Sequence, residues 1–237
     1  MGDVVMITGA SKRLGRAIVT ALAESGYTTI IHTRRADDGV RALSEELGGS
    51  CAVVEGDLTD MQDLGPLFDR AVSLFGHVDH LINSASVFFP LPIEETTIEE
   101  FDRLMALHNT APFFLSRALY LHLKERGGQG SIINIGDATL NSPKASRPAY
   151  YTAKGALMAQ SRALSVALAP TVRVNVISPG PIIPSEDDHA YFARMENLLP
   201  LRRTGASDDI IQAVSYLLSA SFVTGTELVV DGGLTLL

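Results

Sequence analysis

The chain has 237 residues, enough for one α/β domain with a large buried core. Its formal net charge of −8 argues against a nucleic-acid-binding protein, which normally carries a basic surface. No apolar run reaches the ~18 residues that a membrane-spanning helix needs, and no basic-then-apolar leader is visible. One cysteine and scattered histidines give no metal-ligand spacing. We therefore expect a soluble, cytoplasmic, single-domain protein without a metal.

Apolar, strand-like runs alternate with helical patterns along the whole chain. With right-handed crossovers, this alternation predicts a doubly wound, mostly parallel sheet with helices on both faces, a Rossmann-type α/β fold of about seven strands. The predicted strands are residues 4–8, 28–33, 50–55, 80–83, 131–135, 172–177 and 227–230; the predicted helices are residues 14–25, 38–47, 61–75, 98–124, 149–169 and 208–219.

Residues 181–200 break this alternation. They are rich in proline, include the acidic cluster Glu186-Asp187-Asp188, and end in a possible short helix at 189–199. Long irregular segments in compact domains are usually functional or disordered. We interpret the segment as a substrate lid, with an inert surface loop as the alternative.

A glycine-rich turn, TGASKRLG, spans residues 8–15 between the first predicted strand and helix. Gly9 can adopt a turn conformation barred to other residues, and Gly15 allows close packing of the helix. Backbone N–H groups and the helix N-terminus in such a turn hold a phosphate. Arg13 stands where a neutral dinucleotide turn usually has another glycine, so it adds a fixed positive charge. An ordinary strand-to-helix turn is the alternative.

The second predicted strand ends in the basic pair Arg34 and Arg35. An acidic residue at this place would bind the ribose 2′-OH of NAD. Arginines suit a 2′-phosphate instead, because guanidinium is a bidentate phosphate partner. Together with Arg13 they favour NADPH/NADP+ as the cofactor, although the pair alone could be solvated surface charge.

Tyr150 and Lys154 are four residues apart at the start of a predicted helix, so both side chains share one face. A cation beside a phenol favours the phenolate and lowers a pKa that is otherwise near 10. A tyrosine tuned in this way exchanges protons with a substrate oxygen or nitrogen. The alternative is an ordinary surface pair.

The order of these motifs resembles the short-chain dehydrogenase/reductase family over essentially the whole chain. The matching residues are Thr8-Gly9 with Gly15, Asn83-Ser84-Ala85, Asn109, Tyr150 with Lys154, Asn175, Ser178-Pro179-Gly180, and the closing segments 222–225 and 230–233. Within that family the chain is most similar to the pteridine reductases. That likeness rests on Arg13, on the segment NSASVFFP at 83–90, on Asp137 in place of a common catalytic serine, and on the basic pair at 34–35.

The resemblance implies roles for individual residues. The cofactor-binding residues would be Gly9, Arg13, Leu14, Gly15, Arg34, Arg35, Asp57, Leu58, Asn83, Ala85, Tyr150, Lys154, Pro179 and Gly180. Among these, Asp57 would contact the adenine amino group, and Pro179-Gly180 would border the nicotinamide. The helix asparagine of the family, which supports a water chain to the lysine, would be Asn109. A homotetramer is also implied, with the helices at 98–124 and 149–169 as interface candidates, although packing within one subunit explains their apolar faces equally well.

The substrate would contact Arg13, Ser86, Phe88, Asp137 and Tyr150. A planar pterin could stack between Phe88 and the nicotinamide, unless Phe88 is a core or lid residue. An ionised Asp137 cannot donate a hydrogen bond and would repel a carbonyl oxygen, so it suits a substrate with N–H groups. Asp137 would either act as an acid or orient Tyr150.

The sequence therefore predicts an NADPH-dependent reductase that transfers hydride to the pyrazine ring of a dihydropterin, dihydrofolate or oxidised pterin. Tyr150, assisted by Asp137, would protonate the adjacent nitrogen. One alternative is a carbonyl reductase, such as a 3-oxoacyl thioester reductase, which leaves Arg13 and Asp137 unexplained. Another is an NADP(H)-binding sensor without turnover, for which the pair of Tyr150 and Lys154 would have no use.

Overall fold

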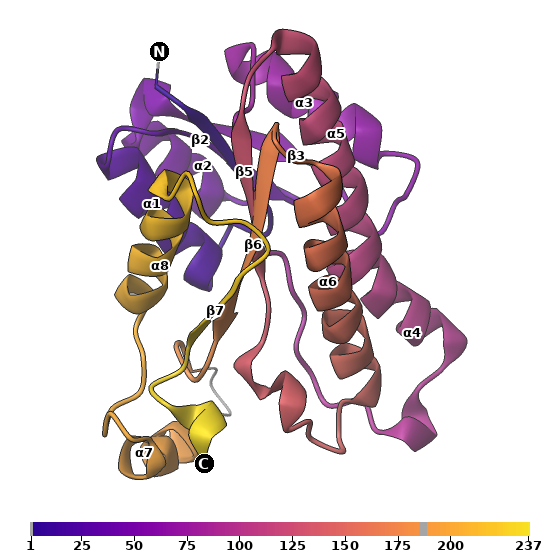
Figure 1. Cartoon of the computed structure of the whole chain (residues 1–237), viewed down its shortest axis with the longest axis vertical. Coiled ribbons are helices and arrows are strands. Elements are labelled where there is room, and N and C mark those ends of the chain that lie inside the picture. The colour runs from indigo at the N-terminus through magenta and orange to yellow at the C-terminus, as the bar shows by residue number, and fades with distance from the viewer. Residues whose placement is uncertain (1, 185–188) are drawn as a thin grey trace.

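A computed structural model describes residues 2–184 and 189–237. Its strands form one sheet in the order β3-β2-β1-β4-β5-β6-β7, and every neighbouring pair is parallel (Figure 1). The strands are β1 Val4–Ile7, β2 Thr28–Thr33, β3 Cys51–Glu55, β4 His80–Asn83, β5 Gly130–Ile135, β6 Val172–Pro179 and β7 Glu227–Val230. The expected doubly wound sheet is thus confirmed. Its order reverses between β1 and β4, the place where such sheets form a ligand crevice at the carboxyl ends of the strands.

Helices cover both faces of the sheet (Figure 1). One face carries α1 (Arg13–Glu24), α2 (Asp38–Glu46) and α8 (Ser207–Ser219). The other carries α3 (Leu64–Phe75), α5 (Ala111–Arg126) and α6 (Pro148–Ala167). Short 3₁₀ turns occupy Gly48–Ser50, Ile93–Glu95, Ala138–Asn141 and Leu234–Leu236.

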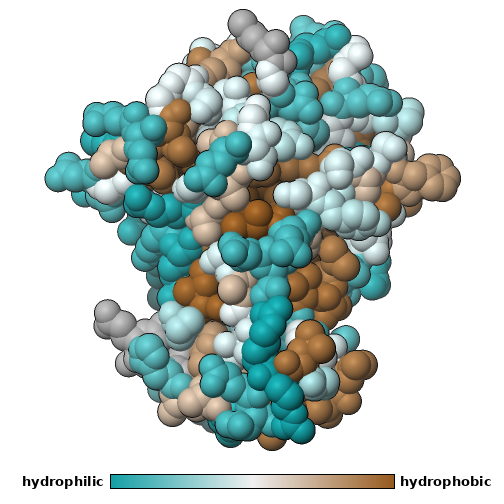
Figure 2. Space-filling model, turned by 90° about the vertical axis from the view of Figure 1, so that its left-hand side faces the viewer, coloured by the Kyte–Doolittle hydropathy of each residue, from teal (hydrophilic) through white to brown (hydrophobic). Residues whose placement is uncertain are grey.

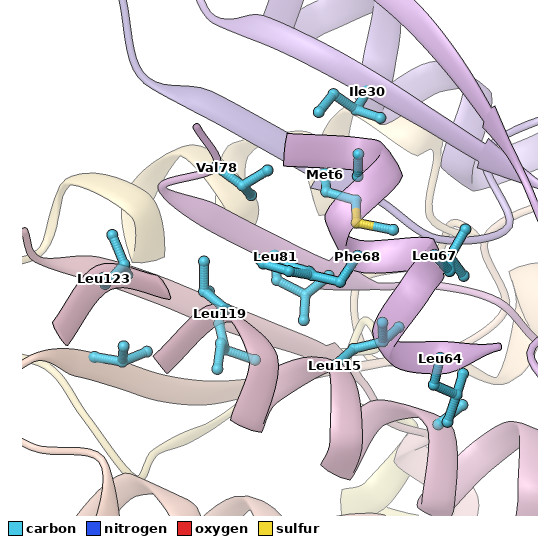
Figure 3. Close-up of a cluster of buried hydrophobic side chains, with 14 of the residues drawn as sticks. Met6, Ile30, Leu64, Leu67, Phe68, Val78, Leu81, Leu115, Leu119 and Leu123 are labelled. Carbon is cyan, nitrogen blue, oxygen red and sulfur yellow. The ribbon is translucent and has the colours of Figure 1, made fainter. Parts of the chain in front are cut away.

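The two hydrophobic cores follow from strand alternation. Along β1, Val5 and Ile7 pack into one core while Met6 packs into the other, because successive side chains point to opposite faces. Figure 3 shows Met6 beside α3 and α5, where Leu115, Leu119 and Leu123 recur every fourth residue along one side of α5. Each such fully buried leucine contributes roughly 2 kcal/mol of hydrophobic stabilisation.

The single helix predicted at 98–124 is interrupted. The chain forms α4 (Ile98–Met105), a π-helical turn at Ala106–Thr110, and then α5. Pro112 is the second residue of α5, so it has no N–H to donate to the carbonyl of residue 108, and its ring crowds that carbonyl. The backbone widens instead, and the N–H of Ala111 reaches back to the carbonyl of Ala106. Turns of this kind are frequent at functional sites.

The segment predicted as a lid contains the expected short helix, α7 (His189–Leu198). This helix lies beyond the carboxyl ends of the strands, close to the C-terminus at the bottom of Figure 1. In Figure 2 apolar side chains gather at the narrowing between the lower end of the molecule, which contains α7, and the larger upper part. The acidic cluster 186–188 lies outside the described residues. None of the described helices has the length and apolar character needed to cross a membrane.

A buried histidine fixes the glycine turn to the sheet. His32, on β2, accepts a hydrogen bond from the backbone N of Gly9 at Nδ1 (3.3 Å) and donates from Nε2 to the carbonyl of Gly56 (3.1 Å). Burial lowers the pKa of His32 to about 4, against the opposing effect of the bond to Gly56. The ring is therefore neutral when it holds the turn.

We expect stability to fall as the pH drops from 6.5 towards 4. In that range unfolded His32 binds a proton that the folded ring refuses, so protonation favours the unfolded chain. At about 1.4 kcal/mol per pKa unit the loss is on the order of 3 kcal/mol. Urea unfolding at a series of pH values measures it. His32→Gln, which does not titrate, should be less stable at pH 7 but show a shallower slope, and an unchanged slope would contradict the assignment.

Candidate active site

A cavity of about 270 Å³ opens at the carboxyl ends of the strands. It brings together predicted residues from distant parts of the chain: Arg13, Leu14, Ser86, Phe88, Asp137, Tyr150, Lys154, Pro179 and Gly180. Two further cavities, of about 330 and 600 Å³, are lined by neither Tyr150 nor Lys154. The chemistry-bearing side chains therefore converge on the first cavity.

The glycine turn is in close contact with the end of β4. Gly9 has a left-handed φ of 66°, and a Cβ there would lie 2.5 Å from the Cα of Ala85. A Cβ on Gly15 would lie 2.6 Å from the carbonyl oxygen of Gly9. The hydroxyl of Thr8 accepts from the backbone N of Ser84 (3.0 Å) and of Ala85 (3.1 Å). Larger residues at either glycine position would separate β1 from β4 or α1 from the turn.

Arg13 adopts the conformation of the glycine that it replaces. Its φ is 52°, in the left-handed region, which costs a residue with a side chain roughly 1 to 2 kcal/mol. Its guanidinium donates to the carbonyls of Ile183 (2.7 Å) and Pro184 (3.3 Å). Arg13 thus connects the turn to the first part of the predicted lid.

Tyr150 is hydrogen-bonded to the side chain of Asp137. Its hydroxyl donates to Oδ2 of Asp137 at 2.8 Å, while Oδ1 of Asp137 accepts from the backbone N (2.7 Å) and hydroxyl (2.6 Å) of Thr139. Burial, followed by the neighbouring Asp137, raises the pKa of Tyr150 well above its usual 10. This corrects the expectation that Lys154 lowers that pKa: the phenol is a protonated donor.

Lys154 points to the backbone of β5 rather than to the phenol oxygen. Its Nζ donates to the carbonyl of Ile135 at 2.7 Å and lies 5.9 Å from the centre of the Tyr150 ring. Burial lowers the pKa of Lys154 to about 8, against the opposing effect of Asp137. The ammonium group of Lys154 therefore lies at the floor of the cavity, and it is not a main influence on the pKa of Tyr150.

The expected role of Asn109 in a water chain to Lys154 stays a prediction. Asn109 lies in the π-helical turn and donates from Nδ2 to Oε1 of Gln160 at 2.8 Å, and it is not among the residues that line the cavity. The residue of this turn that contacts Tyr150 is His108, with ring centres 5.4 Å apart. Sequence reasoning missed His108 because a histidine in an apolar helix pattern gives no signal of its orientation.

The remaining cofactor candidates lie around the turn. Arg34 and Arg35 are exposed at the end of β2. Asp57 is exposed and accepts from the backbone N (2.9 Å) and hydroxyl (2.7 Å) of Thr59, bonds that lower its pKa. Leu58 is buried, so only its backbone can face a ligand. Asn83 donates to Oδ1 of Asn134 at 2.7 Å, and its own Oδ1 has no hydrogen-bond partner within the described residues.

Aromatic and cationic side chains form the outer wall of the cavity. Phe88 is 48% exposed, and its ring lies edge-on to Tyr150 (4.9 Å) and under the guanidinium of Arg147 (4.1 Å). Phe89 packs instead against a small buried cluster around Leu104. The cavity is also lined by residues that were not singled out, namely Thr139, Lys144, Arg147, Ile182, Tyr191 and Phe192. Three of these, Ile182, Tyr191 and Phe192, had a signal, since they belong to the predicted lid at 181–200.

Comparison with known proteins identifies the family. The profile of the enoyl-(acyl carrier protein) reductase family matches residues 9–235. The 3beta-hydroxysteroid dehydrogenase 1 of Eggerthella lenta is 34% identical, with 99% of this chain and 94% of that protein aligned. The NADP-dependent (R)-specific alcohol dehydrogenase of Lentilactobacillus kefiri is 32% identical, with 99% and 97% aligned. The chain belongs to the short-chain dehydrogenase/reductase family. It is an oxidoreductase.

One solved structure is similar in both fold and sequence. It is the FolM alternative dihydrofolate reductase 1 of Brucella canis complexed with NADP, with a TM-score of 0.91 and 32% identity over 99% of this chain and 95% of that one. The names of the relatives give different substrates. Family membership therefore does not identify the substrate, which has to be inferred from the residues that line the cavity.

We expect Arg13→Gly and Arg13→Ala to differ in stability although both lose the same guanidinium. Glycine accepts the left-handed φ and alanine does not, so the glycine variant should be more stable by about 1 kcal/mol. Urea unfolding measures the difference. Arg202, the other described non-glycine residue with positive φ (54°), gives the matched control pair, because it lies outside the cavity. Equal stability of the two Arg13 variants would show that the left-handed φ at position 13 does not strain a residue with a side chain.

Proposed function

We propose that this oxidoreductase is an NADPH-dependent reductase of pterins, acting on a dihydropterin, dihydrofolate or an oxidised pterin. The observation that carries the proposal is the hydrogen bond from Tyr150 to Asp137 at 2.8 Å. It places an acceptor-only carboxylate and a protonated phenol side by side in the cavity. The NADP-complexed dihydrofolate reductase that this chain resembles supports the same assignment.

The residues present fit NADPH. The glycine turn offers backbone N–H groups at the N-terminus of α1, and Arg34 and Arg35 offer cations for a 2′-phosphate. The unpartnered Oδ1 of Asn83 offers a buried acceptor at the end of β4. When bound, the cofactor supplies the hydride that a pyrazine-ring carbon accepts. Lys154, at the cavity floor, would hold the nicotinamide ribose, with Asp57, Ala85 and Pro179-Gly180 along the remaining length.

The polarity of the cavity favours a substrate with N–H groups. Tyr150 has a single hydroxyl hydrogen, so it must turn away from Asp137 to protonate either a ketone oxygen or a pterin nitrogen. A pterin ring can replace the lost donor by giving an N–H to Asp137, whereas a ketone oxygen only accepts hydrogen bonds and leaves Asp137 unpaired. The missing bond to a charged group is worth about 1.5–3 kcal/mol, or roughly ten- to hundredfold in rate.

Phe88 supplies a surface for a flat ring. Its exposed side chain stands beside Tyr150, and the guanidinium of Arg147 supports it by a cation–π contact. Stacking on such a ring adds about 0.5–1.5 kcal/mol beyond simple burial. We therefore place the pterin against Phe88, with Arg13 and Ser86 at its polar edge.

A carbonyl reductase is the second candidate function. The names of the hydroxysteroid and alcohol dehydrogenases that this chain resembles favour it. The same Tyr150 and Lys154 would act, but Asp137 would stand against the carbonyl. An NADP(H)-binding sensor without turnover leaves the buried Tyr150 and Lys154 without a use.

We also propose that the enzyme is a homotetramer. Phe113, Phe114 and Leu121 on α5 are 39%, 46% and 44% exposed, and Val166 on α6 is 79% exposed. Large apolar side chains on neighbouring helices are typical of a surface that a second subunit covers. Light scattering that gives the mass of a monomer would refute this.

We expect purified enzyme to oxidise NADPH with dihydrobiopterin, dihydromonapterin or dihydrofolate. It should turn over an acetoacetyl thioester at least tenfold more slowly, because a ketone has no N–H to replace the hydrogen bond that Asp137 loses when Tyr150 donates its proton. Loss of NADPH absorbance measures each rate, with biopterin testing oxidised pterins. Turnover of the thioester alone would establish the carbonyl reductase instead. Cofactor binding without any turnover would establish the sensor.

We expect Asp137→Ser to lower kcat/KM for the best pterin by about ten- to hundredfold and to narrow the preference over the thioester, since serine can donate to a carbonyl. Tyr150→Phe should lower both activities by about a hundredfold or more, because it removes the proton donor. Steady-state kinetics on variants with native circular dichroism measures both. An Asp137→Ser enzyme with an unchanged preference would remove the basis for the pterin assignment.

A further inference from the structure

His108 is a buried histidine that the proposed chemistry does not use. It sits in the π-helical turn, 1% exposed, at the junction of α4, the segment after β4 and the start of α6. Its ring lies nearly perpendicular to that of Tyr150, with ring centres 5.4 Å apart, and its Nε2 lies 3.0 Å from the hydroxyl of Ser86. Both neighbours line the cavity.

The backbone around His108 determines which ring nitrogen carries the hydrogen. Nδ1 lies 3.1 Å from the carbonyl oxygen of Leu104, which can only accept, so Nδ1 must be protonated. Nε2 lies 3.3 Å from the backbone N of Val87, which can only donate, so Nε2 must carry the lone pair. The ring is thus a neutral tautomer with both nitrogens engaged. Burial, and secondarily the charge of Lys154, lowers its pKa to about 3, consistent with that state.

This tautomer also fixes the direction of the bond to Ser86. Because Nε2 has no hydrogen, the hydroxyl of Ser86 must be the donor in the 3.0 Å contact. The alternative acceptor, the carbonyl oxygen of Val87, is 3.5 Å away, at the limit of a hydrogen bond. With its hydrogen directed into the protein, the Ser86 oxygen faces the cavity with lone pairs only.

We propose that His108 is a positioning residue that makes Ser86 a hydrogen-bond acceptor toward the cavity, and so selects a substrate that presents an N–H or NH₂ group there. The proposal rests on the proposed function, because it specifies the edge of the pterin that Ser86 binds. Ser86 and Asp137 then form two acceptors on the polar wall, which a pterin satisfies with its N–H groups and a ketone does not.

The tautomer is tested first, without any substrate. In protein labelled with ¹⁵N-histidine, His108 should show a protonated Nδ1 and a bare Nε2 that do not titrate from pH 5 to 9. Ser86→Ala should shift the Nε2 resonance of His108, because it removes a hydrogen bond to that atom. A protonated Nε2, a titration near pH 6.5, or an Nε2 resonance unmoved by Ser86→Ala would overturn the proposal whether or not pterins are turned over.

Kinetics test the selection step. His108→Phe keeps the ring volume but frees the Ser86 hydroxyl, so KM for the best pterin should rise about tenfold while kcat changes much less. Ser86→Ala should have a similar effect, and the double variant should be no worse than either single variant. His108→Gln restores an acceptor and should recover most of the affinity.

His122 provides the matched control. It also accepts a backbone N–H at Nε2, from Val78 (3.4 Å), but it is not among the residues that line the cavity. His122→Phe should leave KM unchanged. Additive effects in the double variant, or a fall in kcat without a change in KM, would show that His108 serves only packing.

Discussion

The close contact between the carboxyl ends of β1 and β4 determines the geometry of the site. Gly9 has no side chain where Ala85 approaches, and the Thr8 hydroxyl binds two successive backbone N–H groups of the β4 end. This contact brings Arg13, from the glycine turn, and Ser86 and Phe88, from the segment after β4, to the same cavity. The relative positions of the cavity-lining groups after β1 and after β4 therefore depend on this contact.

Acid–base tuning in this cavity runs opposite to the usual picture of a lysine that activates a tyrosine. Burial and Asp137 raise the pKa of Tyr150 and keep it protonated, while burial lowers the pKa of Lys154 to about 8. A protonated phenol is a proton donor, which is the role that a reductase needs. His32 and His108 are neutral because burial lowers their pKa values, so they add no positive charge near the cavity and act through hydrogen bonds.

Much of the architecture could be predicted from the sequence because it depends on local pattern: apolar runs gave the strands, and glycines marked the turn at 8–15. Helical spacing placed Tyr150 and Lys154 on one face, and the family resemblance assigned Asp137 to the same site. Orientation could not be predicted, because it depends on tertiary contacts. His108 and Asn109 are adjacent in the chain, yet His108 contacts Ser86 and Tyr150 while Asn109 bonds to Gln160. Arg147 and Lys144 gave no signal because their partners are distant in sequence.

The π-helical turn has a consequence for how this part of the fold is assembled. A regular α-helix rotates about 100° per residue, so one additional residue in a turn changes the phase of everything that follows. Leu104 of α4 can therefore face a small cluster with Leu91 and Ala153, while Leu115 of α5 faces the main core beneath the sheet. The π-helical turn therefore allows α4 and α5, which follow each other directly, to pack against two different hydrophobic clusters.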